Sequence, residues 1–214
     1  MKAWGIALIC ALGFAGLVWW LPMDGTSALD RSFQTALGGR AGTEPVAALL
    51  ALNGLGSTFA FGGVTLVAAL LAWVMRFRKE AAALVLTVLV AQLLNTGLKV
   101  LFERDRPVHN GWISVDGYSF PSGNAMVGMA LYGMLIVIVW SCARSGLARW
   151  GMAVIGMLLI LLIGFSRLYV GVHYATDIIA GYVAGLFCVA AVAGLLRLDG
   201  GVSSRRRRSY LSFP

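Results

Sequence analysis

Residues 81–100 of the chain, AAALVLTVLVAQLLNTGLKV, carry a single charged side chain, Lys99, close to their end. A helix of 20 residues is roughly 30 Å long, about the thickness of the hydrocarbon layer of a bilayer. Backbone amides in lipid must find hydrogen bonds within the chain, so such a segment is expected to be helical. Further apolar runs lie near residues 4–21, 57–75, 121–142, 150–166 and 176–196. The sequence therefore predicts an all-α polytopic membrane protein, a bundle of about six transmembrane helices.

The composition favours the same fold class. Of the 214 residues, 59% are hydrophobic and 12% charged, with a mean hydropathy of +0.84, whereas ordinary soluble domains are about one-quarter charged. We expect one integral membrane domain over residues 1–197 and a basic tail over residues 198–214. A removed signal peptide is the alternative for the first span, with a weak cleavage motif at Thr26-Ser27-Ala28. The apolar run Ala3–Leu21 exceeds the usual ~7–15 residues of a signal peptide, which favours a retained anchor.

The distribution of charge predicts an orientation. With the N-terminus in the cytoplasm, 11 of the 17 Lys and Arg residues fall on the cytoplasmic side and six on the outer side. The positive-inside rule therefore predicts that both termini are cytoplasmic. We interpret the run Arg205–Arg208 as an anchor at the anionic inner leaflet rather than as a nucleic-acid site. Because Cys10, Cys142 and Cys188 lie in or at the edge of spans, no disulfide or metal framework is expected.

The segment between the first two spans, residues 22–56, differs from the rest. Apolar residues at fourfold spacing alternate with polar ones and predict a short amphipathic helix at the membrane interface: Leu29, Phe33 and Leu37 beside Asp30, Arg31 and Gln34. Val46–Leu52 is either a second short helix or an extension of the second span. In the last span, Gly181 and Gly185 form a GxxxG pattern, which predicts close helix packing within the chain rather than dimerisation.

Three short motifs begin or end spans on the predicted outer face. They are Lys99-(six residues)-Arg106-Pro107, Pro121-Ser122-Gly123-Asn124 and Ser166-Arg167-(five residues)-His173-(three residues)-Asp177. A cation at the end of a span often only reaches to the interface, and this is the alternative for each one alone. Three cations on the side where topology disfavours positive charge instead indicate an anion site. The neighbouring charges are expected to solvate the loop: Glu103, Arg104, Asp105 and Asp116.

The third motif places His173 and Asp177 one helical turn apart, so we expect both side chains to face the same way. A neutral imidazole held at one nitrogen by a carboxylate presents its other nitrogen as a nucleophile or base. The alternative is an interfacial histidine followed by an acidic helix cap. Pro121-Ser122-Gly123 is expected to open the fourth span, where free backbone N–H groups and the helix dipole can bind phosphate. Together the motifs indicate phosphoryl chemistry at the membrane surface.

With these motifs the chain resembles the type 2 phosphatidic acid phosphatase / haloperoxidase superfamily, whose pattern is K-x6-R-P, P-S-G-H and S-R-x5-H-x3-D. The resemblance covers residues 99–177, and the spacing agrees fully within the first and third motifs. It implies that His173 is the nucleophile and that Asp177 orients it. It further implies a set of groups that hold the phosphate and stabilise the transition state: Lys99, Arg106, Ser122, Gly123 and Arg167.

The sequence departs from this pattern at Asn124, where the family has the histidine that protonates the leaving group. Asparagine cannot transfer a proton at ordinary pH, and three explanations stay open. Asn124 is a natural or engineered loss of the acid; or it suits diphosphate substrates, whose leaving phosphate needs no proton; or His109, the other histidine of the chain, supplies one. An exposed loop residue is the simpler interpretation of His109.

The resemblance thus implies a membrane phosphatase that acts on a lipid phosphate or diphosphate through a phosphohistidine. Undecaprenyl diphosphate, phosphatidylglycerophosphate and phosphatidic acid are the expected substrate types. The expected partners are this lipid and the bilayer, and no nucleic acid, metal or other cofactor is expected. The expected localisation is the cell membrane, with the site facing the periplasm or the cell exterior. A lipid phosphotransferase and a catalytically silent phosphate-lipid binder are the alternatives, the second because of Asn124. A haloperoxidase is disfavoured, since those relatives resemble soluble proteins.

Overall fold

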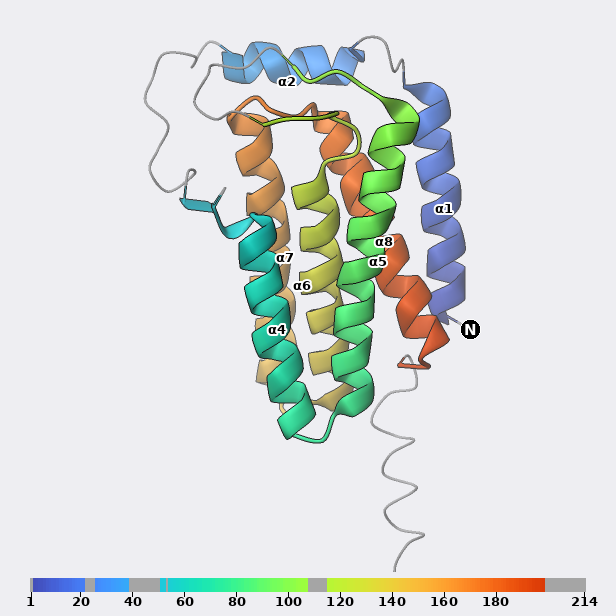
Figure 1. Cartoon of the computed structure of the whole chain (residues 1–214), viewed down its shortest axis with the longest axis vertical. Helices are drawn as coiled ribbons and strands as arrows, with labels where there is room; N and C mark the ends of the chain where they lie inside the picture. Colours follow the sequence, from blue (N-terminus) through green and yellow to red (C-terminus); the bar gives the residue numbers. More distant parts are fainter. Residues whose placement is uncertain (1, 22–25, 39–50, 53, 108–114, 199–214) are drawn as a thin grey trace, which may run out of the picture.

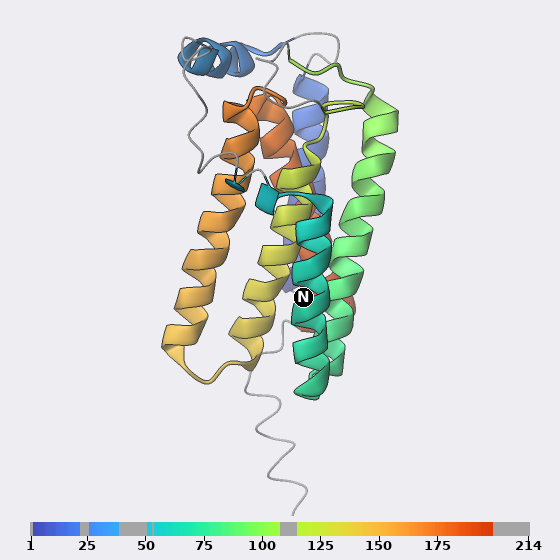
Figure 2. The same ribbon diagram turned by 60° about the vertical axis from the view of Figure 1, so that its left-hand side comes forward.

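The computed structural model of the chain describes residues 2–21, 26–38, 51–52, 54–107 and 115–198. Within them lie the helices α1 (Lys2–Trp20), α2 (Ala28–Gly38), α4 (Thr58–Val74), α5 (Arg78–Phe102), α6 (Gly123–Cys142), α7 (Gly146–Tyr169) and α8 (Ala175–Leu195). All except α2 run along the long axis of the bundle, and α2 lies across one end (Figure 1, Figure 2).

The prediction of an all-helical membrane bundle is confirmed. Five of the described helices are long and apolar enough to cross a bilayer, and α4 is apolar but shorter, with 17 residues. Large apolar side chains stay exposed on the lipid-facing sides of the helices, such as Leu8, Ile9 and Leu70. Such exposure is costly in water but suits a hydrocarbon solvent.

The predicted interfacial helix corresponds to α2. Its residues 31–36 are exposed, so this helix adds little to the core. The predicted helix Val46–Leu52 lies for the most part outside the described residues, as does the basic tail beyond residue 198.

Helix α6 lies at the centre of the bundle and contacts α4, α5, α7 and α8. Its contact with α8 is close because both glycines of the GxxxG pattern face it. A Cβ atom on Gly185 would lie 2.5 Å from the carbonyl oxygen of Met126, and one on Gly181 would lie 2.7 Å from that of Ser122. The pattern thus serves packing within one chain, as predicted.

The two ends of the bundle differ. Lys2, Ser141 and Leu198 line one apolar pocket, which places the start of α1 and the ends of α6 and α8 together. The opposite end carries α2, residues 103–107 after α5, residues 115–122 before α6, and the turn between α7 and α8 (Figure 1). All three sequence motifs lie at this second end.

Candidate active site

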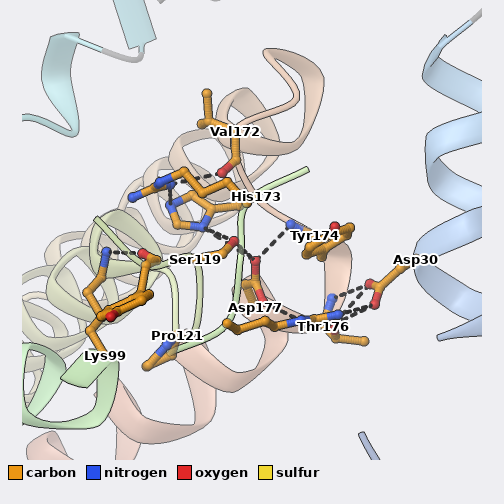
Figure 3. A network of polar contacts seen from close by, with 12 residues as sticks. Asp30, Lys99, Ser119, Pro121, Val172, His173, Tyr174, Thr176 and Asp177 are labelled. Atoms are coloured by element: carbon orange, nitrogen blue, oxygen red, sulfur yellow. Dashed lines mark hydrogen bonds and ion pairs between the residues drawn. The ribbon is translucent and has the colours of Figure 1, made fainter. Parts of the chain in front are cut away.

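Two loops bring the three motifs together. Arg106 follows α5, and Ser119 precedes the start of α6. The turn after α7 leads through His173 into α8, and Figure 3 shows Ser119 beside His173. The backbone N–H of Ser122 donates to the carbonyl oxygen of Asp177 at 3.0 Å, which fixes the start of α6 against the start of α8. The side chain of Asn95 in α5 donates to the carbonyl oxygen of Pro121 at 3.2 Å and holds the other side of this loop.

His173 lies at the centre of the site, two residues before α8 begins rather than on the helix itself. Its Nδ1 lies 3.5 Å from Oδ2 of Asp177 and 3.3 Å from the hydroxyl of Ser119. Its Nε2 lies 3.3 Å from Nη1 of Arg106. The contact with Asp177 is therefore made across the start of the helix, and not along one helical turn as the spacing suggested.

The residues around His173 determine which ring nitrogen carries the proton. With Asp177 at Nδ1 and a guanidinium, which has no acceptor, at Nε2, the proton belongs on Nδ1 and the lone pair on Nε2. Burial lowers the pKa of His173 to about 4; Asp177 opposes this shift, and the charges of Arg106 and Arg167 add to it. The imidazole is therefore neutral at neutral pH, and its unprotonated nitrogen faces Arg106.

Of the three predicted cations, Arg106 lies at Nε2 of the ring, and Lys99 and Arg167 are close enough for their charges to act on Arg106 and on each other. Arg106 is held by backbone carbonyls, with Nε 2.8 Å from the oxygen of Gly117 and Nη1 2.9 Å from that of Val172. Arg167 is buried, and Lys99 lies within electrostatic range of both arginines. The ammonium of Lys99 donates to the carbonyl oxygen of Tyr118 at 2.8 Å. Like charges are held together here, an arrangement that suits a bound anion.

The start of α6 supplies hydrogen-bond donors. Ser122 is fully buried, and its Oγ has no hydrogen-bond partner among the described residues. Gly123 begins the helix, and a Cβ there would lie 2.9 Å from Oδ1 of Asn95, so a larger residue would crowd this loop. Asn124 follows and is partly exposed. The first N–H groups of a helix have no partner within it, so they are available to an anion together with the Ser122 hydroxyl.

The prediction that Arg104 solvates the loop is wrong. Arg104 is 1% exposed and forms ion pairs with Asp177 at 2.7 Å and with Asp30 of α2 at 2.9 Å. A guanidinium can be buried here because two carboxylates and the hydroxyl of Thr176 accept its protons. The other charges of this loop, Glu103, Asp105 and Asp116, are exposed as expected.

Sequence reasoning thus missed four polar residues of the site: Asp30, Arg104, Ser119 and Thr176. Ser119 lies just outside the second motif, and its hydroxyl donates to Asp177. His109, the alternative proton donor, lies outside the described residues. Among the residues that the structure describes, no group of three or more His, Cys, Asp or Glu side chains is arranged to hold a metal ion.

The chain is similar in sequence and in fold to known proteins. The sequence model of the PAP2 superfamily matches residues 80–198. Phosphatidylglycerophosphatase B of Bacillus subtilis (strain 168) is 31% identical over 104 residues, which are 48% of this chain and 51% of that protein. The match thus spans about half the length of this relative.

Two solved structures share the fold. The crystal structure of a transmembrane PAP2-type phosphatidylglycerolphosphate phosphatase from Bacillus subtilis superposes with a TM-score of 0.77 at 22% identity, over 88% of this chain and 94% of that one. The crystal structure of Aquifex aeolicus LpxE superposes with a TM-score of 0.61 at 20% identity, over 81% of this chain and 99% of that one.

Proposed function

This chain belongs to the PAP2 superfamily, and we propose that it is a membrane phosphatase that removes a phosphate from a lipid phosphate or diphosphate. The observation that carries the proposal is His173: a neutral imidazole with a carboxylate at Nδ1 and, at Nε2, the guanidinium of Arg106, whose charge interacts with those of Lys99 and Arg167. A nucleophile next to an anion site is what transfer of a phosphoryl group requires.

In the proposed reaction on a lipid diphosphate, the lone pair of His173 Nε2 attacks the terminal phosphorus and the bond to the bridging oxygen breaks, which yields a phosphohistidine and the lipid monophosphate. Water then attacks the same phosphorus, the N–P bond breaks, and inorganic phosphate leaves. The imidazole gains positive charge while it carries the phosphoryl group, and Asp177 at Nδ1 stabilises that charge. Since Asp177 already holds Nδ1, the ring needs no reorientation before it attacks.

The transferred group carries negative charge on its three equatorial oxygens, which the remaining residues would bind. Arg106 and Arg167 offer planar guanidinium groups that match two oxygens at once, and Lys99 adds a point charge. Ser122 Oγ and the N–H groups of Gly123 and the residue after it complete the set. Donors that are fixed before the reaction stabilise the transition state without reorganisation, which is commonly the largest single contribution to catalysis.

Asn124 bears on the substrate. It stands at the second residue of α6, where the family pattern has the histidine that protonates the leaving oxygen. A lipid diphosphate expels a phosphate monoester, whose second pKa is near 6 and which leaves without a proton. A phosphomonoester expels an alkoxide, and its cleavage is about 10²–10⁴-fold slower without a general acid to protonate that oxygen. We therefore favour a lipid diphosphate of the undecaprenyl type over phosphatidic acid or phosphatidylglycerophosphate.

The orientation follows from the charges. The end of the bundle opposite the site carries Lys2, Arg78, Lys79 and Arg149, in agreement with the positive-inside rule if that end is cytoplasmic. The site would then face the cell exterior or periplasm, and the lipid tail would reach it from the outer leaflet.

The test is release of inorganic phosphate from undecaprenyl diphosphate, phosphatidylglycerophosphate and phosphatidic acid, each in mixed micelles with the purified chain. We expect release from the diphosphate and none from the His173→Ala variant. The Asn124→His variant should gain far more on the two monoesters than on the diphosphate. Equal rates of the wild-type chain on phosphatidic acid and on the diphosphate would contradict the preference, and full activity of His173→Ala would overturn the mechanism.

Asn124 also favours a second candidate, a phosphate-lipid binder without catalysis. No release from either the wild-type chain or Asn124→His, together with binding of the lipid, would establish it. A phosphotransferase would instead pass the phosphoryl group to an added lipid alcohol, which appears as a phosphorylated acceptor in the same assay. The His109→Ala variant tests whether His109 is the proton donor, because full activity of that variant would show that it is not.

A further inference from the structure

A buried group of charges lies behind His173, on the side away from the proposed phosphate site. Arg104 stands between two carboxylates, with Nη1 2.7 Å from Asp177 and Nη2 2.9 Å from Asp30. All three side chains are at most 1% exposed. The guanidinium also stacks on the ring of Tyr174, 4.3 Å from its centroid. The three sequence motifs assign no role to Arg104 or Asp30.

The two oxygens of Asp177 have separate partners. Oδ1 accepts from Arg104, while Oδ2 faces His173 and accepts from Ser119 and from the backbone N–H of Tyr174. Arg104 therefore fixes the orientation of the carboxylate from the Oδ1 side, together with the two donors that hold Oδ2 toward the imidazole. It also supplies the positive charge that keeps a buried carboxylate ionised. A carboxylate that is free to rotate, or that takes up a proton, could no longer hold the Nδ1–H of His173.

Arg104 is in turn oriented by α2. Asp30 accepts from Nη2 of Arg104, and its two oxygens also accept from the backbone N–H and the hydroxyl of Thr176. Asp30 is fully buried although residues 31–36 of the same helix are exposed. In Figure 3, Asp30 reaches from α2 to Thr176 and the start of α8. Helix α2 is thus attached to the site through a carboxylate and not through an apolar face.

We propose that Arg104 and Asp30 are positioning residues of this phosphatase: Asp30 orients Arg104, and Arg104 holds the Asp177 carboxylate in the rotamer that fixes the Nδ1–H form of His173. The proposal rests on the proposed function, because it assigns the two residues to the same reaction. It gives α2, which the sequence suggested only as an interfacial helix, a supporting role in the reaction through the single residue Asp30.

Steady-state kinetics test the proposal through a double-mutant cycle. Arg104→Gln and the nearly isosteric Asp30→Asn should lower kcat by roughly 10–100-fold, as loss of such supporting groups does elsewhere, with little change in KM. In an Asp177→Asn background the same two substitutions should lower kcat by less than about twofold, because the carboxylate that Arg104 and Asp30 position is already absent. Equal losses in both backgrounds would overturn the proposal, since a merely structural role does not depend on Asp177.

Matched controls and a conservative variant sharpen this test. Arg31→Gln and Asp105→Asn remove an exposed cation and an exposed carboxylate from the same two segments, and both should leave kcat unchanged. Arg104→Lys keeps the charge but cannot reach both carboxylates, so it should recover only part of the lost kcat. Full recovery by lysine would contradict the bridging role of the guanidinium.

A spectroscopic readout separates this proposal from the function itself. The chain has two histidines, so ¹⁵N-histidine labelling of a His109→Gln variant reports His173 alone. The spectrum should show a neutral ring protonated on Nδ1, and the additional change Arg104→Gln should give a mixture of tautomers. An unchanged spectrum would overturn the positioning role even if the protein releases phosphate. Absence of phosphate release with the predicted spectral change would overturn the function and leave the positioning intact.

Discussion

Acidification from pH 7 to pH 5 should leave the first step of the reaction nearly unaffected. Burial lowers the pKa of His173 to about 4, so about 90% of the imidazole stays neutral at pH 5. A solvent-exposed histidine with the usual value of 6.5 would be neutral to only about 3% at that pH. The two cases differ roughly 30-fold in the amount of nucleophile. Because the pKa is lowered, the neutral imidazole that can attack is fully populated at neutral pH and is lost only as the pH falls through about 4.

The assay is single-turnover cleavage of a lipid diphosphate between pH 4 and pH 7. The titration of the substrate phosphates is measured by ³¹P NMR in the same micelles and divided out. His109→Gln is the control, because it removes the other titrating imidazole and should give the same profile. An acid limb with an apparent pKa near 6.5 in both proteins would refute the claim that burial holds His173 neutral.

Three further changes test other parts of the site. Gly181→Ala places a Cβ 2.7 Å from the Ser122 carbonyl oxygen, so it should destabilise the folded chain by about 1–3 kcal/mol, measured by thermal unfolding. The control is Gly63→Ala, where the space around the new Cβ is open and no destabilisation is expected. Equal melting temperatures of the two variants would contradict the packing argument. Ser119→Ala removes a donor to Asp177 and should lower kcat roughly tenfold, whereas an unchanged kcat would show that Ser119 does not support the carboxylate. Lys99→Met should raise the inhibition constant of inorganic phosphate by about tenfold or more, and unaltered inhibition would remove Lys99 from the anion site.

The spans could be predicted from the sequence because hydropathy is a local property. The apolar run 81–100 lies within α5 (Arg78–Phe102), and the run 150–166 lies within α7 (Gly146–Tyr169). In both cases the helix extends beyond the apolar run, since polar residues at the interface can continue a helix whose centre lies in lipid. The GxxxG pattern was likewise local and correctly predicted a close helix contact.

The polar interior of the site could not be predicted in this way. Arg104 and Arg106 are two residues apart and carry the same charge, but one is buried between carboxylates and the other faces His173. The chain leaves the helix at Glu103, whose φ is 46°, so no helical period relates these side chains. Asp30 and Thr176 are 146 positions apart, and a contact of that kind leaves no trace in a single sequence.

The central claim is that His173 carries the phosphoryl group. A rapid single turnover with lipid diphosphate labelled in the transferred phosphate, quenched in alkali to preserve phosphohistidine and analysed by peptide mass spectrometry, tests it directly. The account predicts a phosphoryl group on His173 that appears before free phosphate, remains in His109→Gln and is lost in His173→Ala. Phosphate release without any labelled histidine, or with the label on another residue, would contradict it.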